Sequence, residues 1–299
     1  MPAALAGERL DRVVAMVTGV SRAVAASLVD GGAVELDGRV ERSVKVRVEE
    51  GAALRVQLPA DESHGVQPDA SVPLTVVYAD DDVVVVDKPA GLVVHPGAGN
   101  QTKTLVNGLV ARFPEMADVG DPARPGIVHR LDKGTSGLLA VARSPEAYES
   151  LVEQLSARTV GRSYAALVWG RPEPAVGVID APVGRSSRDR TRMTVSARGR
   201  DARTHYRVQT TYREPAVVSL IECQLETGRT HQVRVHLAAI HHPVVGDTQY
   251  RGAREAIRAP RPMLHARALA FTHPVSGERV DLESPLPADF EAVLAGLSE

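Results

Sequence analysis

Apolar residues alternate with polar ones over short stretches along most of the chain, and segments with helical spacing lie between them. Near the N-terminus, Leu10 and Val13 belong to one predicted helix face, and a second helix follows. Residues 33–36 then alternate like a strand, and Asp37-Gly38 is a strong signal for a two-residue hairpin turn. A second alternating, strand-like stretch follows over residues 44–48. This part of the chain therefore predicts a small module of two helices and short strands.

The larger part of the chain alternates strands and helices irregularly, with several strands adjacent in sequence. That pattern favours an α+β fold with a mixed, mostly antiparallel sheet over a doubly wound parallel one. Strands are predicted at 76–78, 83–86, 138–142, 163–170, 204–211, 217–225 and 264–271, and helices at 105–113, 144–156, 230–240 and 289–297. Ser144 is predicted to cap the second of these helices, and Thr230 the third.

A polar stretch separates the two parts, so we predict three segments. They are a small α/β module over residues 7–60, a linker over 61–73 and a large domain over 74–299. A length of 299 residues also favours two domains over one.

Composition narrows the function classes. The formal net charge is −2 and aromatic residues make up 3%, so a nucleic-acid partner would have to meet a local positive surface rather than a basic protein. The single Cys223 excludes intramolecular disulfides and cysteine metal clusters. We see neither an apolar run of membrane-spanning length nor a signal peptide, and we expect a cytoplasmic protein with no membrane partner.

The stretch over residues 126–142 carries the first candidate for chemistry. Asp132 lies between Arg130 and Lys133, in a turn flanked by apolar segments. Neighbouring cations favour the ionised form of a carboxylate. Such a group could be a nucleophile, a metal ligand or half of an ion pair, and taken alone a structural turn aspartate is the simplest interpretation.

Two other kinds of site find little support. His231 and His236 are five residues apart, which fits one helix face poorly, and the two-histidine motif of helical zinc sites is absent. No Gly-x-Ser-x-Gly elbow of a serine hydrolase occurs. We therefore predict no metal site, and a metal-dependent hydrolase stays a weak third hypothesis.

Three motifs, in this order, resemble the RluA-type family of RNA pseudouridine synthases. They are residues 129–138 (HRLDKGTSGL), Arg162-Ser163-Tyr164, and residues 225–237 (LETGRTHQVRVHL). Residues 87–96 (DKPAGLVVHP) match the entry motif of that family, and the wording is most similar to its RluD-like branch, which modifies large-subunit ribosomal RNA. Gly134 and His241 differ from the residues usual in the motifs of that family, at positions that carry no chemistry.

The N-terminal module resembles the S4 RNA-binding domain. The similarity rests on the Arg-Leu-Asp at residues 9–11, on Ser21-Arg22 at the second helix, and on the Gly-x-Val-x-Leu-Asp-Gly that follows. Separately, residues 172–203 are rich in Gly, Pro and Arg, and the density of arginine predicts a loop or hairpin that faces RNA. The residues predicted to contact RNA are Arg9, Arg12, Ser21, Arg22, Arg185, Arg190 and Arg192.

The resemblance implies roles for particular residues. Asp132 matches the nucleophile of the family, Tyr164 its active-site tyrosine, and Arg229 the arginine that pairs with the aspartate. Further residues of the motifs are expected to bind substrate. These are His129, Arg130, Leu131, Thr135, Ser136, Gly137, Thr230, His231, Gln232, Arg234 and Leu264.

The implied reaction breaks the N-glycosidic bond of a uridine, turns the base and joins C5 to the sugar, so it needs no cofactor. Asp132 could attack C1′ or add to C6 of the uracil, and both routes stay open. The expected partner is 23S ribosomal RNA or an assembling large ribosomal subunit. The alternative is a non-catalytic S4-containing RNA-binding protein in ribosome assembly.

Overall fold

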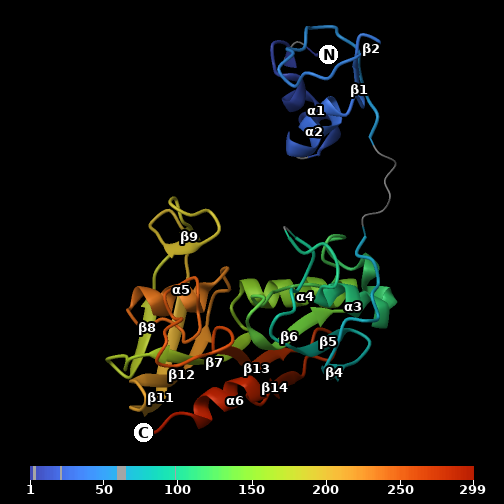
Figure 1. Ribbon diagram of the computed structural model, residues 1–299. Coiled ribbons are helices and arrows are strands. Elements are labelled where there is room, and N and C mark those ends of the chain that lie inside the picture. Colours follow the sequence, from blue (N-terminus) through green and yellow to red (C-terminus); the bar gives the residue numbers. More distant parts are fainter. Residues whose placement is uncertain (3–4, 21, 59–64, 98) are drawn as a thin grey trace. The chain divides into compact units, whose positions relative to one another are not determined.

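The computed structural model describes residues 1–2, 5–20, 22–58, 65–97 and 99–299 (Figure 1). The predicted RNA contact at Ser21 therefore lies outside the described residues. The chain divides into two compact units, Met1–His64 and Gly65–Glu299, which are described separately. No single helix among these residues is long and apolar enough to cross a membrane; only the bent pair α1–α2 meets that criterion, by length and composition alone.

The first unit holds two helices and a three-stranded sheet in the order β2-β1-β3. Asp37 and Gly38 both have positive φ, 51° and 79°, as the predicted tight hairpin requires. The strand predicted over residues 44–48 is absent as a regular strand, and only an isolated bridge joins Arg9 to Arg47 there. The elements are α1 (Leu10–Thr18), α2 (Arg22–Asp30), β1 (Val34–Leu36), β2 (Arg39–Val40) and β3 (Leu54–Val56).

The second half of the predicted linker packs on the large unit. Asn107 donates its side-chain amide to the Gln67 carbonyl at 2.7 Å, and its own carbonyl accepts from the Asp69 amide at 3.0 Å. Val72 is buried. Polar composition suggested a free connection, but these backbone bonds make residues 65–73 part of the large unit, so their assignment to a linker was wrong.

The large unit is built on a nine-stranded sheet in the order β4-β5-β6-β13-β7-β12-β11-β8, with β14 also paired to β13. Among the described strands of this sheet, only β6 and β13 pair in parallel, so the prediction of a mixed, mostly antiparallel sheet is confirmed. The strands are β4 (Val76–Ala79), β5 (Val83–Lys88), β6 (Ser136–Ala142), β7 (Gly161–Trp169), β8 (Val176–Asp180), β11 (Arg203–Tyr212), β12 (Val218–Leu225), β13 (Leu264–Thr272) and β14 (Arg279–Glu283). A separate hairpin of β9 (Val183–Arg185) and β10 (Met193–Val195) projects from this unit (Figure 1).

Helices cover both faces of the sheet. The cluster that holds α3 and α5 uses one set of alternating strand residues, and the clusters that hold α4 and α6 use the other set. Figure 1 shows α5 and α6 on opposite sides. The helices are α3 (Leu105–Arg112), α4 (Pro145–Ser156), α5 (Gln232–Ala239) and α6 (Ala288–Ala295), with a 3-10 turn at Pro114–Asp118.

The starts of two helices bear on the predictions. The hydroxyl of Ser144 accepts from the Ala147 amide at 3.2 Å, which confirms the predicted cap of α4. The cap predicted at Thr230 is wrong, because α5 begins one residue later and His231, at φ 57°, is its N-cap. That shift fixes which side chains of the third motif face the cleft described below.

Gly137 sets the contact between β6 and β13. Its φ is +113°, and an added Cβ would lie 2.2 Å from the Ala266 carbonyl oxygen. Gly137→Ala is expected to lower the free energy of unfolding by about 2–4 kcal/mol, from backbone strain and overpacking together. The control is Gly277→Ala, where φ is +72° with no atom within 4 Å of the added Cβ. Equal losses for the two variants in urea unfolding would contradict this account.

Candidate active site

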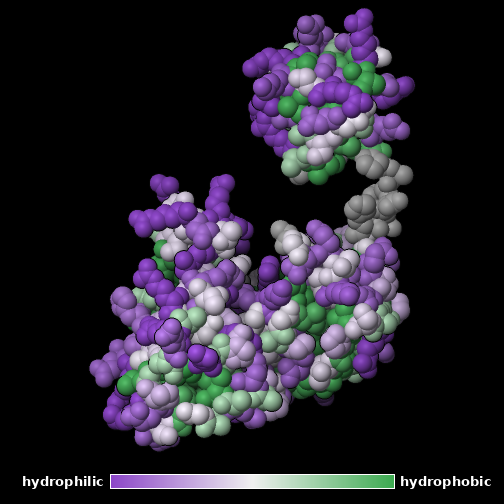
Figure 2. Space-filling view, viewed as in Figure 1, coloured by the Kyte–Doolittle hydropathy of each residue, from purple (hydrophilic) through white to green (hydrophobic). Residues whose placement is uncertain are grey.

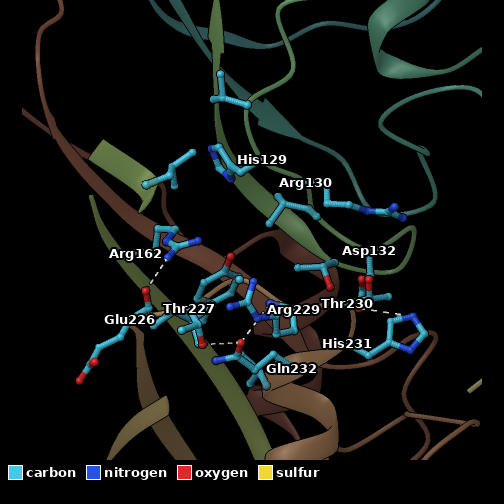
Figure 3. A pocket seen from close by; sticks show the side chains of 18 of the residues that line it. His129, Arg130, Asp132, Arg162, Glu226, Thr227, Arg229, Thr230, His231 and Gln232 are labelled. Carbon is cyan, nitrogen blue, oxygen red and sulfur yellow. Dashed lines mark hydrogen bonds and ion pairs between the residues drawn. The ribbon is translucent and has the colours of Figure 1, made fainter. Parts of the chain in front are cut away.

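A cleft of about 730 Å³ lies where the turn before β6, strand β7, and the segment between β12 and α5 meet (Figure 3). The topology brings these segments together because β13 pairs with both β6 and β7. Most of the predicted site residues line the cleft. They are His129, Arg130, Leu131, Asp132, Thr135, Tyr164, Arg229, Thr230, His231, Gln232, Arg234 and Leu264.

Asp132 presents its carboxylate to the cleft, and its cationic partner is Arg234. One Nη of Arg234 donates to Oδ2 of Asp132 at 3.0 Å. Arg234 also forms a two-point ion pair with Asp247, at 2.6 and 3.0 Å, and donates to Gln249 at 2.8 Å. The expectation that Arg229 pairs with Asp132 is therefore wrong for this structure.

Burial holds the Asp132–Arg234–Asp247 unit in one geometry. Asp247 is fully buried, and the Arg234 side chain is 7% exposed. Burial alone would lower the pKa of Arg234, but the hydrogen bond and charge of Asp247, with Asp132, raise it above its usual value. The guanidinium therefore stays charged, and its planar donors fix the direction of the Asp132 carboxylate.

Arg229 lies in the same cleft but makes different contacts. Its Nε donates to the Asp201 carbonyl at 2.9 Å, and its backbone amide donates to the side chain of Gln232 at 3.0 Å. Burial and then the charge of Arg200 lower the pKa of Arg229. Because α5 begins at residue 232, the arginine of its first turn, rather than the arginine of the preceding loop, meets Asp132.

His231 stands beside the same carboxylate. Its Nε2 is 3.9 Å from Oδ2 of Asp132, and its Nδ1 shares a 2.8 Å hydrogen bond with the Tyr250 hydroxyl. Burial lowers the pKa of His231, against the opposing charge of Asp132. Tyr250, whose ring lies 5.0 Å from the Arg234 guanidinium carbon, was missed by the sequence analysis, and no motif in the sequence pointed to it.

Tyr164 forms part of the cleft wall on β7 and is 7% exposed. Burial raises the pKa of Tyr164 to about 12, with Asp132 acting in the same direction and Arg162 against it. The phenol therefore keeps its proton at neutral pH and can donate a hydrogen bond. Leu131 and Leu264, both buried, supply apolar wall at this place, so the cleft offers a partly apolar seat for a flat base.

His129 is neutral at physiological pH. Its Nε2 accepts a hydrogen bond from the Ala140 amide at 3.1 Å, which needs an unprotonated nitrogen. Burial, and then the charge of Arg162, lower the pKa of His129 to about 3.

This depressed pKa predicts a pH dependence of stability. Between about pH 6.5 and 3 the unfolded chain binds a proton at His129 that the folded chain does not, so stability falls as pH falls through this window. This single group contributes a slope of at most about 1.4 kcal/mol per pH unit. His129→Gln, which keeps an acceptor for Ala140, is expected to show a correspondingly shallower slope in urea unfolding between pH 6 and 4.5. Identical slopes for the two proteins would contradict the assignment.

Two predicted substrate contacts are structural instead. Ser136 is buried, and its hydroxyl bonds Nδ1 of His265 at 3.0 Å across the β6–β13 junction. Gly137 packs against the Ala266 backbone. Neither lines the cleft, because β6 has already entered the sheet at these positions, so their placement as substrate contacts was wrong.

Gln232 lines the cleft yet serves mainly to hold its rim. Its side-chain oxygen accepts from the Thr227 hydroxyl at 2.8 Å and from the Arg229 amide at 3.0 Å. Its amide nitrogen donates to the Arg203 carbonyl and to Thr204, each at 3.0 Å. These four bonds fix the loop between β12 and α5.

The predicted RNA-facing arginines of the hairpin differ from one another. Arg185 and Arg190 are exposed, and Figure 2 shows hydrophilic residues gathered over the hairpin tip. Arg192 instead turns inward: it donates to the Gln249 carbonyl, and its guanidinium carbon lies 5.2 Å from the Tyr250 ring centre. Arg192 is therefore held against the residues of the site, and its predicted contact with RNA stays a prediction.

The arginines of the N-terminal unit pair with its own acids. Arg9 and Arg22 bind the two carboxylate oxygens of Asp11, at 3.0 and 2.9 Å, and Arg12 binds Glu8 at 2.9 Å. All three side chains keep 40% exposure or more. They lie on the surface of this unit, and their contact with RNA stays a prediction.

The histidines in and shortly after the third motif have protein partners. His236 bonds Thr204 and the Ala181 carbonyl, and His242 bonds the Trp169 carbonyl. Away from the cleft, Asp80, Asp82 and His273 bring ligand atoms within 4.8 Å of one another, the spacing of a possible metal site. Asp80 already accepts from His273 and from backbone amides of its own turn, which gives this group a structural role.

Comparison with known proteins decides the family. Residues 82–239, which include the Asp132, Tyr164 and Arg234 positions, match the family model described as RNA pseudouridylate synthase. The chain belongs to the RNA pseudouridine synthase family. The resemblance to its RluA-type members is thereby confirmed, and the enzyme class is that of an isomerase acting on uridine in RNA.

Relatives extend over the whole chain. It is 44% identical over 313 residues to a protein of Xanthomonas campestris named ribosomal large subunit pseudouridine synthase D, covering 100% of this chain and 92% of that protein. It is 46% identical over 300 residues to an uncharacterised RNA pseudouridine synthase of Chloroflexus aurantiacus, covering 100% and 93%. The first of these names supports the predicted RluD-like branch.

A solved structure shows the same fold. Human RNA pseudouridylate synthase domain containing 1 is 30% identical to this synthase, with a TM-score of 0.60, and the match covers 78% of this chain and 91% of that one. The match to the family model begins at residue 82, so it does not include the N-terminal unit. The S4-like resemblance of that unit therefore stays a prediction.

Proposed function

We propose that this synthase converts uridines of large-subunit ribosomal RNA into pseudouridine, with Asp132 as the nucleophile and without a cofactor. The observation that carries the proposal is the Asp132 carboxylate in the cleft, fixed by Arg234, with the protonated Tyr164 phenol on the same wall. The target in ribosomal RNA is supported by the names of relatives that are matched over 86–92% of their own length.

The site suits the chemistry. The Asp132 carboxylate can attack C1′ as the uracil departs, or add to C6 of the base. Arg234 holds that carboxylate in position in either case, through a charged hydrogen bond. The target base must leave its stack, at a cost of a few kcal/mol that is least in a loop. The apolar wall of Leu131 and Leu264 and the flat ring of Tyr164 would receive it.

RNA outside the cleft would meet positive side chains on two further surfaces. The β9–β10 hairpin exposes Arg185 and Arg190, and the N-terminal unit exposes Arg9, Arg12 and Arg22. We propose that the N-terminal unit binds RNA in the manner of an S4 domain. With a net charge of −2, these local patches would supply the attraction to phosphate.

The test is chemical mapping of pseudouridine in ribosomal RNA from a strain that lacks the gene, complemented with wild-type protein or with Asp132→Asn. We expect at least one large-subunit position to lose the modification, the wild-type gene to restore it, and the variant not to restore it. An unchanged large-subunit map would contradict the proposed substrate. Full restoration by Asp132→Asn would contradict the nucleophile and favour a role in ribosome assembly through RNA binding alone.

A further inference from the structure

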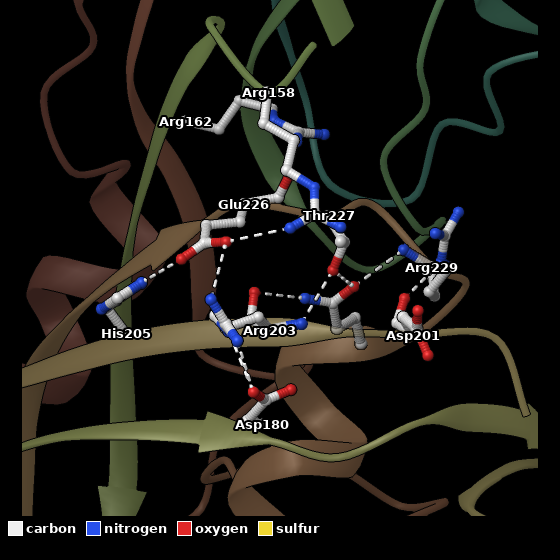
Figure 4. Close-up of polar contacts among 10 residues, drawn as sticks. Arg158, Arg162, Asp180, Asp201, Arg203, His205, Glu226, Thr227 and Arg229 are labelled. Carbon is white, nitrogen blue, oxygen red and sulfur yellow. Dashed lines mark hydrogen bonds and ion pairs between the residues drawn. The ribbon is translucent and has the colours of Figure 1, made fainter. Parts of the chain in front are cut away.

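Arg162 lies in the cleft wall with its charge unmatched. It is 7% exposed and stands two residues before Tyr164 on β7, so both side chains leave the same face of the strand. One Nη donates to the Glu226 carbonyl oxygen at 3.3 Å (Figures 3 and 4). Among the described residues, Nε of Arg162 is the only buried side-chain nitrogen or oxygen without a hydrogen-bond partner.

The side chain of Glu226 does not neutralise Arg162, although its backbone carbonyl accepts from that arginine. The side chain of Glu226 instead bonds Arg158 at 3.2 Å, Arg203 at 3.5 Å and His205 at 2.7 Å (Figure 4). The second acid that lines the cleft, Asp132, is taken by Arg234. A buried guanidinium without an anionic partner is costly, and proteins normally pair such a group.

The loop is shaped to keep that guanidinium in place. An added Cβ on Gly228 would lie 2.7 Å from an Nη of Arg162, and Gly228 has no positive φ that would itself require glycine. The glycine in the third motif therefore makes room for the Arg162 side chain.

Further cations gather around Arg162. Arg158, Arg200 and Arg229 line the same part of the cleft. The charges of Arg200, Arg158 and Arg162 each lower the pKa of Arg229, after burial as the main cause. Several positive charges close together in a cleft indicate a binding site for an anion. The guanidinium group of arginine can form two parallel hydrogen bonds to a phosphate.

We propose that Arg162, together with Arg158, Arg200 and Arg229, forms a phosphodiester subsite that binds the backbone of the RNA strand next to the target uridine. The assignment rests on the proposed RNA substrate, whose only anionic groups are its phosphodiesters. Arg162 is the fixed centre of the subsite, because Glu226 and Gly228 hold its position. The more exposed arginines close over the phosphate from the rim.

The test uses full-length protein and a set of RNA stem-loops that carry the target uridine, each with one neutral methylphosphonate linkage near it. For wild type, neutralising one particular linkage is expected to raise Kd about tenfold. Arg162→Gln is expected to raise Kd for unmodified RNA by the same factor and to reduce the slope of log K against log salt by about 0.7. For this variant, neutralising that linkage should cause no further rise in Kd. Arg207→Gln, an exposed arginine outside the cleft, is the matched control and should keep the wild-type linkage response.

Gly228→Ala gives an independent variant, since its methyl group would displace the Arg162 guanidinium. It is expected to mimic Arg162→Gln, and the double variant should be no worse than either single one. The subsite is refuted if neutralising the same linkage still raises the Kd of Arg162→Gln tenfold. It is also refuted if the rises in Kd caused by Gly228→Ala and Arg162→Gln are fully additive in the double variant. Wild-type protein that neither binds nor modifies the unmodified stem-loop would instead refute the proposed substrate.

Discussion

Replacement of Arg234 by methionine is expected to lower the free energy of unfolding by about 3–5 kcal/mol, because it leaves the fully buried Asp247 without its cation. Methionine keeps most of the side-chain volume, so the loss reports the charge and hydrogen bonds rather than a cavity. The measurement is equilibrium unfolding in urea at neutral pH.

Arg229→Met is the matched control for this effect. It removes the same kind of side chain from the same motif, but that side chain bonds only a backbone carbonyl. We expect a loss of at most about 1 kcal/mol, as for other surface substitutions. Combining Arg234→Met with Asp247→Asn should recover part of the loss, since the two residues form one unit. Equal losses from the two arginine replacements would contradict the ion-pair arrangement.

Replacement of Asp132 by asparagine is expected to slow pseudouridine formation by at least about a thousandfold, because an amide cannot act as the nucleophile. The amide oxygen still accepts a hydrogen bond from Arg234, so the fold and the Kd for RNA should change little. Release of tritium from RNA labelled at C5 of uridine measures the reaction, and filter binding measures the affinity.

Asp201→Asn controls for the loss of a negative charge near the cleft, because Asp201 contacts Arg229 through its backbone carbonyl alone. It should keep the wild-type rate within about threefold, the spread expected of a surface change. A fast Asp132→Asn enzyme would remove the nucleophile from the mechanism.

The local elements were predictable where one short signal decides the backbone. Asp37-Gly38 gave the hairpin and Ser144 gave the start of α4, since turn and cap chemistry act over a few residues. The mixed sheet followed from the irregular order of strands and helices. The strand expected at 44–48 failed because pairing depends on a partner elsewhere, which alternation does not reveal.

The site was predictable as a set of segments but not as a set of contacts. The motifs placed Asp132, Tyr164 and the segment after β12 in one cleft. To predict whether Arg229 or Arg234 pairs with Asp132, one must know where α5 begins. With His231 as its N-cap, α5 begins at residue 232, one residue later than a cap at Thr230 would place it. Boundaries of this kind are the least certain part of a pattern.

Other features depend on tertiary packing that no local pattern encodes. Asp247 lies in a turn that looked ordinary, yet it is the buried partner of Arg234. Tyr250 joins His231 to Arg192 across the cleft edge. Ser136 and Gly137 were predicted to be site residues because they follow Asp132 closely in the sequence. They lie outside the cleft because they already belong to β6, within the sheet.

Arg234, rather than Arg229, holds Asp132, the proposed nucleophile. The direct test is the single-turnover rate of tritium release at saturating RNA, measured side by side for Arg234→Lys and Arg229→Lys. Lysine keeps the charge but loses the planar fork that joins Asp132 to Asp247. We predict that Arg234→Lys lowers this rate by at least about a hundredfold, because the charged hydrogen bonds lose their geometry. Arg229→Lys should lower the rate by less than about tenfold. The reverse order, with Arg229→Lys the slower enzyme, would contradict the account.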